Sequence, residues 1–330
     1  MKKKVLIVQP IHESGVEVLE PYFDVKVASD PSIPTLLREI DGAHGAIVRT
    51  APFPAEVIDK ARDLEVIARH GVGVDNIDVE AATSRGIPVV YTPNANAVSV
   101  VEHVIMFMGA LAKVLLPYDK ATREDNFGVR NEYRAVDING KTLGIVGVGR
   151  IGGLLCKKCM AAFDMRVLAY DPYVPAEKIS EIGATPCNDL DELLRESDFV
   201  SLHLPLTDET RNLIGGRELA LMKPTAFLIN AARGGAVEEA ALIDALTNRR
   251  IAGAALDVFE KEPPDPDNPL LKLDNVILTP HSGALTQEAV IRMATGAAEG
   301  VRDVLLGKRP QFVVNPQVFK GWNEQTRHVP

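Results

Sequence analysis

The sequence alternates, almost from end to end, between short apolar runs and stretches of helix-like composition such as EEAALIDALTN at 238–248. A strand that is apolar along its whole length must be buried on both faces, so this alternation indicates parallel sheets with helices on either side. The sequence therefore predicts an α/β chain built on doubly wound parallel sheets. The predicted strands are VLIVQ (5–9), GAIV (45–48), LEVIA (64–68), PVVY (88–91), LGIVG (143–147), RVLAY (166–170), DFVSL (198–202), AFLIN (226–230), AGAALD (252–257) and NVILT (275–279).

The sequence contains two long segments of helical pattern, one from Ser99 to about Leu116 and one from about Gln287 to Leu306. The first separates strands that have no glycine-rich motif from strands that have one. A length of 330 residues is enough for two domains of roughly 150 residues each. We therefore place a domain boundary near residue 98. The periodicity alone leaves open which domain the residues after about 290 join.

The composition limits the class of partner. Lysine and arginine number 36 against 45 acidic residues, and the net charge of -9 argues against nucleic acid or an anionic membrane. A small anion in one local basic pocket stays compatible with this charge. The apolar part of MKKKVLIVQP is too short for a secretory signal, and the longest apolar run, 104–112, cannot span a bilayer. We expect a cytoplasmic protein with no membrane partner.

The chain has three cysteines, a number that suggests a reducing compartment. Cys156 and Cys159 form a C-x-x-C pair, but no second pair and no histidine lies near them in the sequence. We therefore expect these two residues to pack, or to face solvent, on a helix, and we predict no metal site.

A glycine-rich motif, GVGRIG at 147–152, follows a predicted strand and precedes a helical pattern. This context distinguishes a dinucleotide-binding loop from an isolated G-x-G-x-x-G. The glycines Gly147, Gly149 and Gly152 permit a tight turn and let backbone N–H groups approach a pyrophosphate at the helix N-terminus. The alternative interpretation is that they serve only as turn residues.

Asp171 ends the next predicted strand, nineteen residues after Gly152. An acidic residue at about this distance binds the adenosine ribose of a dinucleotide. Its charge would repel a 2′-phosphate, and no arginine follows it in DPYVP, so the pattern favours NAD over NADP. A helix cap is the alternative role for Asp171.

Three residues that follow strands in the second half of the chain could bind and protonate a substrate: Arg233, Glu262 and His281. A guanidinium holds a carboxylate through two charge-assisted hydrogen bonds, worth about 1.5–3 kcal/mol each. Small residues around Arg233 leave room for a substrate. A histidine exchanges protons near neutral pH, and a neighbouring carboxylate favours its charged form. The alternatives are an ion pair of Arg233 with Glu238 or Glu239, and a capping role for His281.

Seven blocks stand in a fixed order along nearly the whole chain: HGVGVDNID (70–78), NANAVSVVEH (94–103), GKTLGIVGVGRIGG (140–153), HLPLT (203–207), NAARGG (230–235), ALDVFEKEPP (255–264) and TPHSG (279–283). Together they make the chain resemble the D-2-hydroxyacid dehydrogenases, the family of phosphoglycerate, hydroxypyruvate and D-lactate dehydrogenases.

The resemblance implies a fold that the spacing of motifs does not show. It implies a Rossmann NAD-binding domain at 99–289 and a flavodoxin-like substrate domain made from both chain ends, 1–98 and 290–330. It places the active site in the cleft between these domains and implies a homodimer. Some phosphoglycerate dehydrogenases carry an added C-terminal regulatory domain, which we expect this chain to lack.

The resemblance also implies roles for single residues. Arg233 matches the clamp on the carboxylate and carbonyl of a 2-oxo acid, His281 matches the acid/base, and Glu262 matches its partner. The residues that match NAD contacts are Arg150 and Ile151 at the pyrophosphate, Leu204 at the adenosine half, Ala231, Ala232 and Asp257 around the nicotinamide, and Gly283 behind it.

In the N-terminal part, the amides of Val72 and Gly73 match a loop that binds the substrate carboxylate. Arg69 matches an arginine that faces a distal anionic group in the phosphoglycerate enzymes, and Arg49 could help it. A surface or interdomain salt bridge is the alternative for both arginines. Structural roles are expected for Asn76, Asp78, His70, His103 and His203.

We therefore expect an NAD-dependent enzyme that interconverts a small D-2-hydroxy acid and its 2-oxo acid, of the phosphoglycerate or the hydroxypyruvate/glyoxylate type. The alternatives are a dehydrogenase of another small anion, such as phosphite, and an NAD(H)-sensing, corepressor-like protein that keeps the same three residues. A formate enzyme is disfavoured, because its histidine pairs with a glutamine where this chain has Glu262. The sequence does not fix which acid is the substrate.

Overall fold

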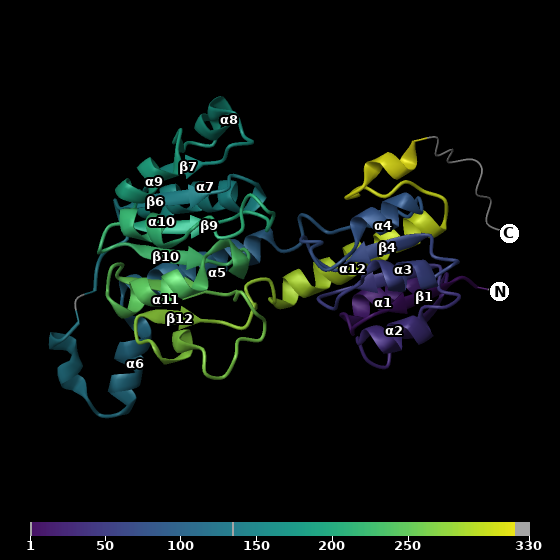
Figure 1. Cartoon of the computed structure of the whole chain (residues 1–330), viewed down its shortest axis with the longest axis horizontal. Helices are drawn as coiled ribbons and strands as arrows, with labels where there is room; N and C mark the ends of the chain where they lie inside the picture. Colours follow the sequence, from purple (N-terminus) through teal and green to yellow (C-terminus); the bar gives the residue numbers. More distant parts are fainter. Residues whose placement is uncertain (1, 134, 321–330) are drawn as a thin grey trace. The chain divides into compact units, whose positions relative to one another are not determined.

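The computed structural model describes residues 2–133 and 135–320, and their contacts divide the chain into two units (Figure 1). The split unit contains the described residues up to Asn96 and those from Leu285 onward, and the central unit runs from Ala97 to Ala284. The boundaries expected near 98 and 290 lie a few residues beyond these two crossings. The chain therefore leaves the split unit, builds the central unit and returns.

The split unit is built on a five-stranded parallel sheet in the order β2-β1-β3-β4-β5. This is the strand order of flavodoxin-like doubly wound sheets. The strands are β1 (Lys4–Ile7), β2 (Asp24–Val27), β3 (Gly45–Val48), β4 (Val66–Arg69) and β5 (Val89–Val90). The helices are α1 (Glu13–Leu19), α2 (Ile33–Glu39), α3 (Ala55–Lys60), α4 (Val79–Ser84), α12 (Gln287–Leu305) and the short 3-10 helix η4 (Pro316–Phe319).

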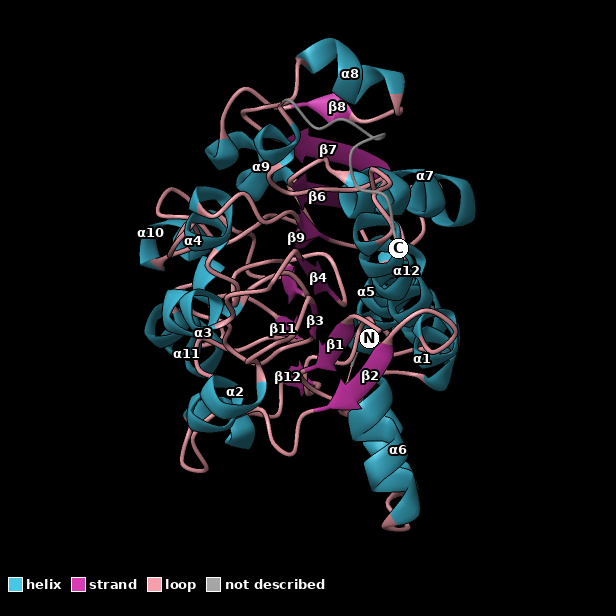
Figure 2. Cartoon of the chain, turned by 90° about the vertical axis from the view of Figure 1, so that its right-hand side faces the viewer, coloured by secondary structure: helices cyan, strands magenta, loops and turns pink. Residues whose placement is uncertain are grey.

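Helices cover both faces of this sheet (Figure 2). On one face α1 packs against α12, over a core that includes Ile7 and Val301. On the other face α2, α3 and α4 bury Leu36 and Ile67 among others. Strand β3 is consequently buried along its whole length, as its continuous apolar run indicates.

The central unit is built on a seven-stranded parallel sheet in the order β12-β11-β10-β9-β6-β7-β8. Counted from β6, this is the Rossmann order with one further strand at the edge. The strands are β6 (Thr142–Val146), β7 (Arg166–Tyr170), β8 (Thr185–Pro186), β9 (Phe199–Leu202), β10 (Phe227–Asn230), β11 (Gly253–Leu256) and β12 (Val276–Leu278). The helices are α5 (Ala97–Ala112), α6 (Leu115–Arg123), α7 (Arg150–Phe163), α8 (Ala176–Glu181), α9 (Leu190–Glu196), α10 (Gly216–Leu221) and α11 (Glu239–Thr247), with the 3-10 helices η1 (Phe127–Asn131), η2 (Gly234–Ala236) and η3 (Pro269–Lys272).

This second sheet is also covered on both faces. Helices α5, α7 and α8 bury Val104, Leu155 and Ile179 on one side. Helices α9, α10 and α11 bury residues such as Leu193 and Leu242 on the other, where Figure 2 shows them opposite α5 and α7. The predicted architecture of two doubly wound parallel sheets is confirmed.

Two strands are missing from the sequence prediction. The strand β2, DVKV, lies at the edge of its sheet and is largely exposed, so it has no continuous apolar run. The strand β8 is only two residues long and lies at the edge of the other sheet. An edge strand needs one partner and one buried face, which makes its sequence signal weak.

The single helix expected from Ser99 to about Leu116 is wrong. Helix α5 ends at Ala112, Val114 adopts a left-handed conformation with φ of 53°, and α6 begins at Leu115. Pro117 explains the break, because inside one continuous helix its ring would clash with an earlier carbonyl and its nitrogen could not donate. In α6 it falls in the first turn, where proline is tolerated.

Among the described residues, no single helix is both long and apolar enough to cross a membrane. Only α5 and α6 taken together, across a bend of 62°, pass on length and composition. The apolar face of α5 lies in the core of the central unit.

Candidate active site

The glycine-rich loop joins β6 to α7 at the carboxyl edge of the central sheet. Gly147 has φ of +93°, and a Cβ there would lie 2.4 Å from the carbonyl oxygen of His203, so only glycine fits. A Cβ at Gly152 would lie 2.1 Å from the carbonyl oxygen of Gly147. Gly149, at the N-cap of α7, instead faces open space. The loop therefore packs tightly at its base and leaves the helix end open to a phosphate.

Asp171 follows β7, and its carboxylate lies against this loop. It accepts hydrogen bonds from the N–H groups of Val148 at 2.8 Å and Tyr173 at 3.0 Å. Arg150 and Ile151 form the first two positions of α7, and Leu204, beyond β9, packs against the edge of the core. The structure thus brings the expected phosphate loop and the expected ribose-binding acid together, and both fit a dinucleotide.

Arg233 ends the turn that follows β10, and its side chain is half-buried. Asn230, itself only 1% exposed, shapes that turn: its side chain donates to the carbonyl of Arg233 at 2.9 Å and accepts from the N–H of Ala232 at 3.1 Å. The guanidinium Nη1 of Arg233 donates to the carbonyl of Ala232 at 2.7 Å. Ala231 and Ala232 carry no more than a methyl group, which leaves space beside the guanidinium.

His281 and Glu262 form a pair. The Nδ1 atom of His281 lies 2.8 Å from Oε2 of Glu262, and the side chains are 45% and 38% exposed. The second oxygen of Glu262 accepts from the N–H of Phe259 at 3.1 Å. A carboxylate can only accept, so Nδ1 carries the proton of this bond and Nε2 is the nitrogen that can exchange a proton with a substrate. Enough of the ring is exposed for a substrate to reach it.

The pKa of Glu262 lies below its ordinary value. Burial acts to raise this pKa, but the hydrogen bond and charge of His281, the N–H of Phe259 and the charge of Arg233 together outweigh burial. Glu262 is therefore a carboxylate at neutral pH. Since β10, β11 and β12 are neighbours in the sheet, the three predicted catalytic residues gather at one edge of it.

Asp257 follows β11 and holds the turn that carries His281. The residue is only 2% exposed. Its Oδ1 accepts from the hydroxyl of Thr279 at 2.6 Å and the N–H of Ser282 at 2.7 Å, and its Oδ2 accepts from the N–H of Gly283 at 2.8 Å. A Cβ at Gly283 would lie 2.9 Å from Oδ2. The close approach of carboxylate and turn therefore requires glycine at that position.

In the split unit, Arg69 ends β4 and a loop at 70–74 follows. The guanidinium folds back onto this loop: Nε donates to the carbonyl of Gly73 and Nη1 to the carbonyl of His70, both at 2.5 Å. The N–H groups of Val72 and Gly73 donate to no other group in the part of the chain that the structure describes. The loop therefore offers two backbone donors and is fixed by an arginine.

The residues around this loop bond mainly to the backbone. The Nη1 atom of Arg49 donates to the carbonyl of Pro10 at 2.8 Å. The side-chain amide of Asn76 donates to the carbonyls of Arg49 and Ala51. Asp78 accepts a backbone N–H at the start of α4 as its N-cap. These contacts agree with the structural roles expected for Asn76 and Asp78.

Two further histidines are poor proton donors. Burial lowers the pKa of His70 to about 4, with help from the charges of Arg49 and Arg69, and burial lowers the pKa of His203 to about 4. Both rings are therefore neutral at pH 7. His203 lies 2.9 Å from the hydroxyl of Ser201, whereas Nε2 of His70 is buried without a hydrogen-bond partner among the described residues.

The cysteines are core residues. All three are free and buried, and Cys156 and Cys159 lie on α7. Burial raises the pKa of both thiols, to about 12 for Cys159. A thiol that stays protonated is a weak nucleophile and a weak ligand. Nor do the described residues contain any group of three or more His, Cys, Asp or Glu side chains that could hold a metal ion.

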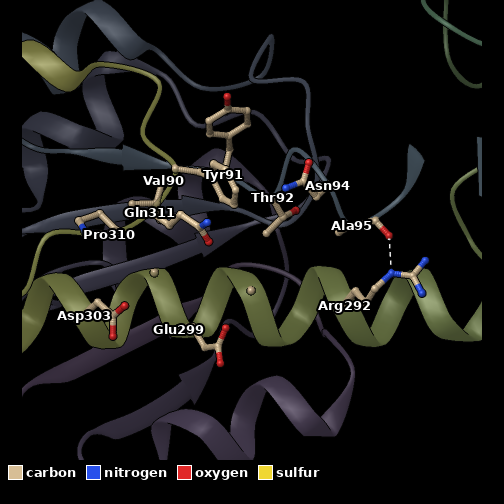
Figure 3. Close-up of a pocket in the computed structure, with 13 residues that line it drawn as sticks. Val90, Tyr91, Thr92, Asn94, Ala95, Arg292, Glu299, Asp303, Pro310 and Gln311 are labelled. Carbon is tan, nitrogen blue, oxygen red and sulfur yellow. Dashed lines mark hydrogen bonds between the residues drawn. The ribbon is translucent and has the colours of Figure 1, made fainter. Parts of the chain in front are cut away.

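A hollow of about 260 Å³ lies in the split unit, between α12 and the segments 90–95 and 310–312 (Figure 3). Its lining contains none of the predicted site residues. Arg292 stands at one end, where its Nε donates to the carbonyl of Ala95 at 2.8 Å. Ligand pockets commonly measure about 300–1,000 Å³. At this volume the hollow is smaller than such pockets, and we assign it no part in the candidate site.

Two supporting side chains were not predicted, Asn230 and Thr279. Each bonds the turn that carries a predicted catalytic residue. Their places beside Arg233 in NAARGG and beside His281 in TPHSG are the signal that could have found them.

Comparison with known proteins shows the family of the chain. A family model described as D-isomer specific 2-hydroxyacid dehydrogenase, NAD binding domain, matches residues 105–283. The D-3-phosphoglycerate dehydrogenase of Methanocaldococcus jannaschii is 45% identical over 313 residues, which cover 94% of this chain and 59% of that protein. The glyoxylate reductase of Korarchaeum cryptofilum is 39% identical over 327 residues, which cover 97% of this chain and 98% of that protein.

The chain thus spans about three-fifths of the length of the phosphoglycerate dehydrogenases that it matches, and nearly all of the glyoxylate reductase. Among solved structures, the D-lactate dehydrogenase of Aquifex aeolicus, in complex with NAD and lactic acid, has a TM-score of 0.83 and 31% identity. The match covers 97% of this chain and 98% of that one.

Proposed function

Because the chain belongs to the D-isomer specific 2-hydroxyacid dehydrogenases, we propose that it interconverts a small D-2-hydroxy acid and its 2-oxo acid with NAD. The observation that carries this proposal is the hydrogen bond of 2.8 Å between His281 and Glu262 at the sheet edge that also holds Arg233. It combines a group that exchanges protons with a group that binds a carboxylate. The glycine loop opens onto the same edge.

In the reductive direction, Arg233 binds the carboxylate and carbonyl oxygen of the 2-oxo acid through its planar fork. Bound NADH supplies the hydride. His281 gives a proton from Nε2 to the carbonyl oxygen, while Glu262 keeps the ring oriented and stabilises its charged form. In the oxidative direction, neutral His281 takes the hydroxyl proton. We expect the N–H groups of Val72 and Gly73, which donate to no other group among the described residues, to bind the substrate carboxylate as well.

The residues that would hold NAD follow the elements of the central unit. Gly149, Arg150 and Ile151 hold the pyrophosphate at the start of α7, and Asp171 binds the adenosine ribose. The charge of Asp171 disfavours a 2′-phosphate, so we expect NADH to be preferred over NADPH. Leu204 contacts the adenosine half, and the residues around the nicotinamide are Ala231, Ala232, Asp257 and Gly283.

Two substrate types are favoured, the phosphoglycerate type and the hydroxypyruvate/glyoxylate type. Each is supported by one of the relatives described above. Arg69 ends β4 and Arg49 follows β3, the neighbouring strand of the split sheet. The two arginines supply the positive charge that an anionic substrate tail needs.

We also propose a cytoplasmic homodimer. The segment of α6 and η1 projects from the central unit in Figure 1 and carries exposed apolar side chains, including Leu115, Leu116 and Phe127, which are 55%, 50% and 70% exposed. Apolar residues gathered on one projecting segment support a protein contact. The three free thiols support a reducing compartment. Sedimentation at the mass of a single chain would rule out the dimer.

The test is NADH consumption by the purified protein with glyoxylate, pyruvate, hydroxypyruvate, phosphohydroxypyruvate and sulfopyruvate, each repeated with NADPH. We expect strong turnover of one of these acids with NADH and weaker turnover with NADPH. No turnover of any acid, together with tight binding of NADH, would contradict the proposed activity. That result would favour the NAD(H)-sensing alternative.

A further inference from the structure

His103 lies on α5 and reaches the turn that carries His281, although it is far from that turn in the sequence. Its Nε2 atom is 3.1 Å from the hydroxyl of Thr279 and 3.6 Å from Oδ1 of Asp257. The ring is held edge-on against Phe107, with centroids 4.2 Å apart. His103 is therefore fixed on its own helix and directed at the turn.

The direction of each hydrogen bond follows from the number of protons. The carboxylate of Asp257 can only accept, so the hydroxyl proton of Thr279 lies in the 2.6 Å bond to Oδ1. The oxygen of Thr279 can then only accept from Nε2 of His103. The chain of donors runs from His103 to Thr279 to Asp257. This order fixes the tautomer of His103, with its proton on Nε2.

The turn that receives these bonds is strained at its centre. His281 has φ of +52°, in the left-handed region that costs a non-glycine residue about 1–2 kcal/mol. Its N–H donates to the carbonyls of Asp257 at 2.8 Å and Thr279 at 3.0 Å. Such a conformation persists where the surroundings over-determine it. Here the surroundings are the carboxylate of Asp257 and, behind it, Thr279 and His103.

We propose that His103 is a positioning residue for His281, acting through Thr279 and Asp257. The proposal rests on the proposed function, since it concerns the geometry of its acid/base. His103 does not touch the reacting atoms. Its N–H holds Thr279 in the rotamer that bonds Asp257, and Asp257 holds the turn in which the ring of His281 meets Glu262. Without this donor, the turn loses one of the bonds that enforce its strained conformation.

The experiment compares two substitutions at one site. His103→Gln keeps an N–H donor at the same number of bonds from the backbone as Nε2, whereas His103→Phe keeps a flat ring and removes the donor. We expect His103→Phe to lower kcat about tenfold, a loss equivalent to one hydrogen bond, with KM for the 2-oxo acid changed less than about twofold. His103→Gln should stay close to the wild type.

A second pair of variants tests the same chain of bonds. Thr279→Val should lower kcat about as much as His103→Phe, and Thr279→Ser should not. Because the residues act through one chain, the double variant His103→Phe with Thr279→Val should be no slower than Thr279→Val alone. Additive losses would overturn the proposal. If His103→Phe does not fold, the Thr279 pair carries the comparison.

A second readout separates this proposal from the proposed function. The chain has seven histidines, so the ring signals can be followed by NMR, with His281→Asn to identify the signal of His281. The pH at which this signal titrates should shift in His103→Phe and stay unchanged in His103→Gln, whether or not any 2-oxo acid is turned over. A purely structural role would lower the melting temperature of both variants and leave kcat and this titration in place. Equal behaviour of the two variants, in kinetics and in NMR, would overturn the proposal.

Discussion

At the carboxyl edges of the two sheets, the residues predicted to act on a substrate are held in different ways. At the edge of the central sheet, side chains from separate segments bond to each other: His281 to Glu262 and Thr279 to Asp257. At the edge of the split sheet, Arg69 bonds to the carbonyls of its own loop. The loop N–H groups at 72 and 73 donate to no group in the described part of the chain.

The same difference appears among the buried groups. The carboxylate of Asp257 in the central unit accepts three hydrogen bonds. In the split unit, Nε2 of His70 and Oδ1 of Asn96 are buried without a partner among the described residues. In the central unit Oδ1 of Asn275 is also unpartnered, but Asn275 precedes β12 and so lies at the opposite edge of that sheet. A reaction needs fixed geometry, which side-chain bonds supply in advance. We infer that the central edge sets the chemistry and that the split edge sets which acid is accepted.

The largest effect should come from Arg233→Lys. If the central edge sets the chemistry, this change should lower kcat/KM for every 2-oxo acid by about 10²–10⁴-fold, because an ammonium cannot replace two charge-assisted hydrogen bonds worth about 1.5–3 kcal/mol each. Steady-state kinetics measures the loss, and fluorescence titration should show unchanged binding of NADH. Arg217→Lys, on an exposed arginine that pairs with Asp191 and Glu218, is the matched control. Full activity of Arg233→Lys would show that Arg233 does not bind the substrate.

The next effect concerns the His281 pair. Glu262→Gln should lower kcat for reduction by about 10²-fold, within the range for losing acid–base catalysis. It should also move the basic limb of the pH profile of reduction to lower pH, because the positive ring of His281 loses the negative charge beside it. Glu238→Gln changes a carboxylate outside the pair and should leave the profile in place. If the basic limb of the pH profile stays at the same pH in Glu262→Gln, Glu262 does not assist the proton transfer.

A smaller and more selective effect should follow from Arg69→Ala. If the split edge reads the substrate tail, KM for phosphohydroxypyruvate should rise about tenfold more than KM for glyoxylate, a difference of about 1.4 kcal/mol. Arg69 also holds the loop at 70–74, so some rise for both acids is expected. Arg49→Ala is the comparison, because Arg49 does not bond to that loop in the contacts above. If KM rose equally for the two acids, Arg69 would stabilise the loop at 70–74 and would not bind the substrate tail.

The smallest effect should be on stability in acid. The pKa of Glu262 is lowered in the folded chain, so its stabilising contribution is present above the ordinary carboxyl value of about 4.5 and is lost as pH falls below it. Wild type and Glu262→Gln should therefore differ near pH 6 and converge toward pH 3, by no more than about 1 kcal/mol for a pair this exposed. Thermal melts across this range measure the difference. If the stability difference between wild type and Glu262→Gln grew as the pH fell, the predicted direction of the effect would be contradicted.

Much of the fold follows from the sequence because a strand buried on both faces must be apolar throughout. Strands β3 and β7 begin and end at the predicted residues, GAIV and RVLAY. The edge strand β2 is not predicted, because one face of DVKV is in solvent. The break at Val114 is not predicted, because the residue that indicates it, Pro117, lies inside the next helix and not at the break.

The candidate site also contains residues that the local sequence predicts and residues that it does not. Residues that end strands, such as Arg233 and His281, are predictable because parallel strands bring their carboxyl ends to one edge. Contacts between segments far apart, such as that of His103 with Thr279, depend on how α5 packs and leave no trace in local spacing. The bonds of Arg69 to its own loop depend on the glycine at 71, with φ of +140°, which lets the loop turn beneath the guanidinium.

The return of the chain to the split unit has a consequence during synthesis. Helix α12 covers one face of the split sheet, over Ile7 and Val66, yet it leaves the ribosome roughly 190 residues after Asn96. At about 5–20 residues per second, that delay is on the order of 10–40 s. Through this interval, in which the central unit is itself being made, the nascent chain carries an apolar sheet face that α12 has not yet covered. The earliest part of the chain to be made is therefore the last to be completed, and it is the part that a chaperone would have most reason to hold.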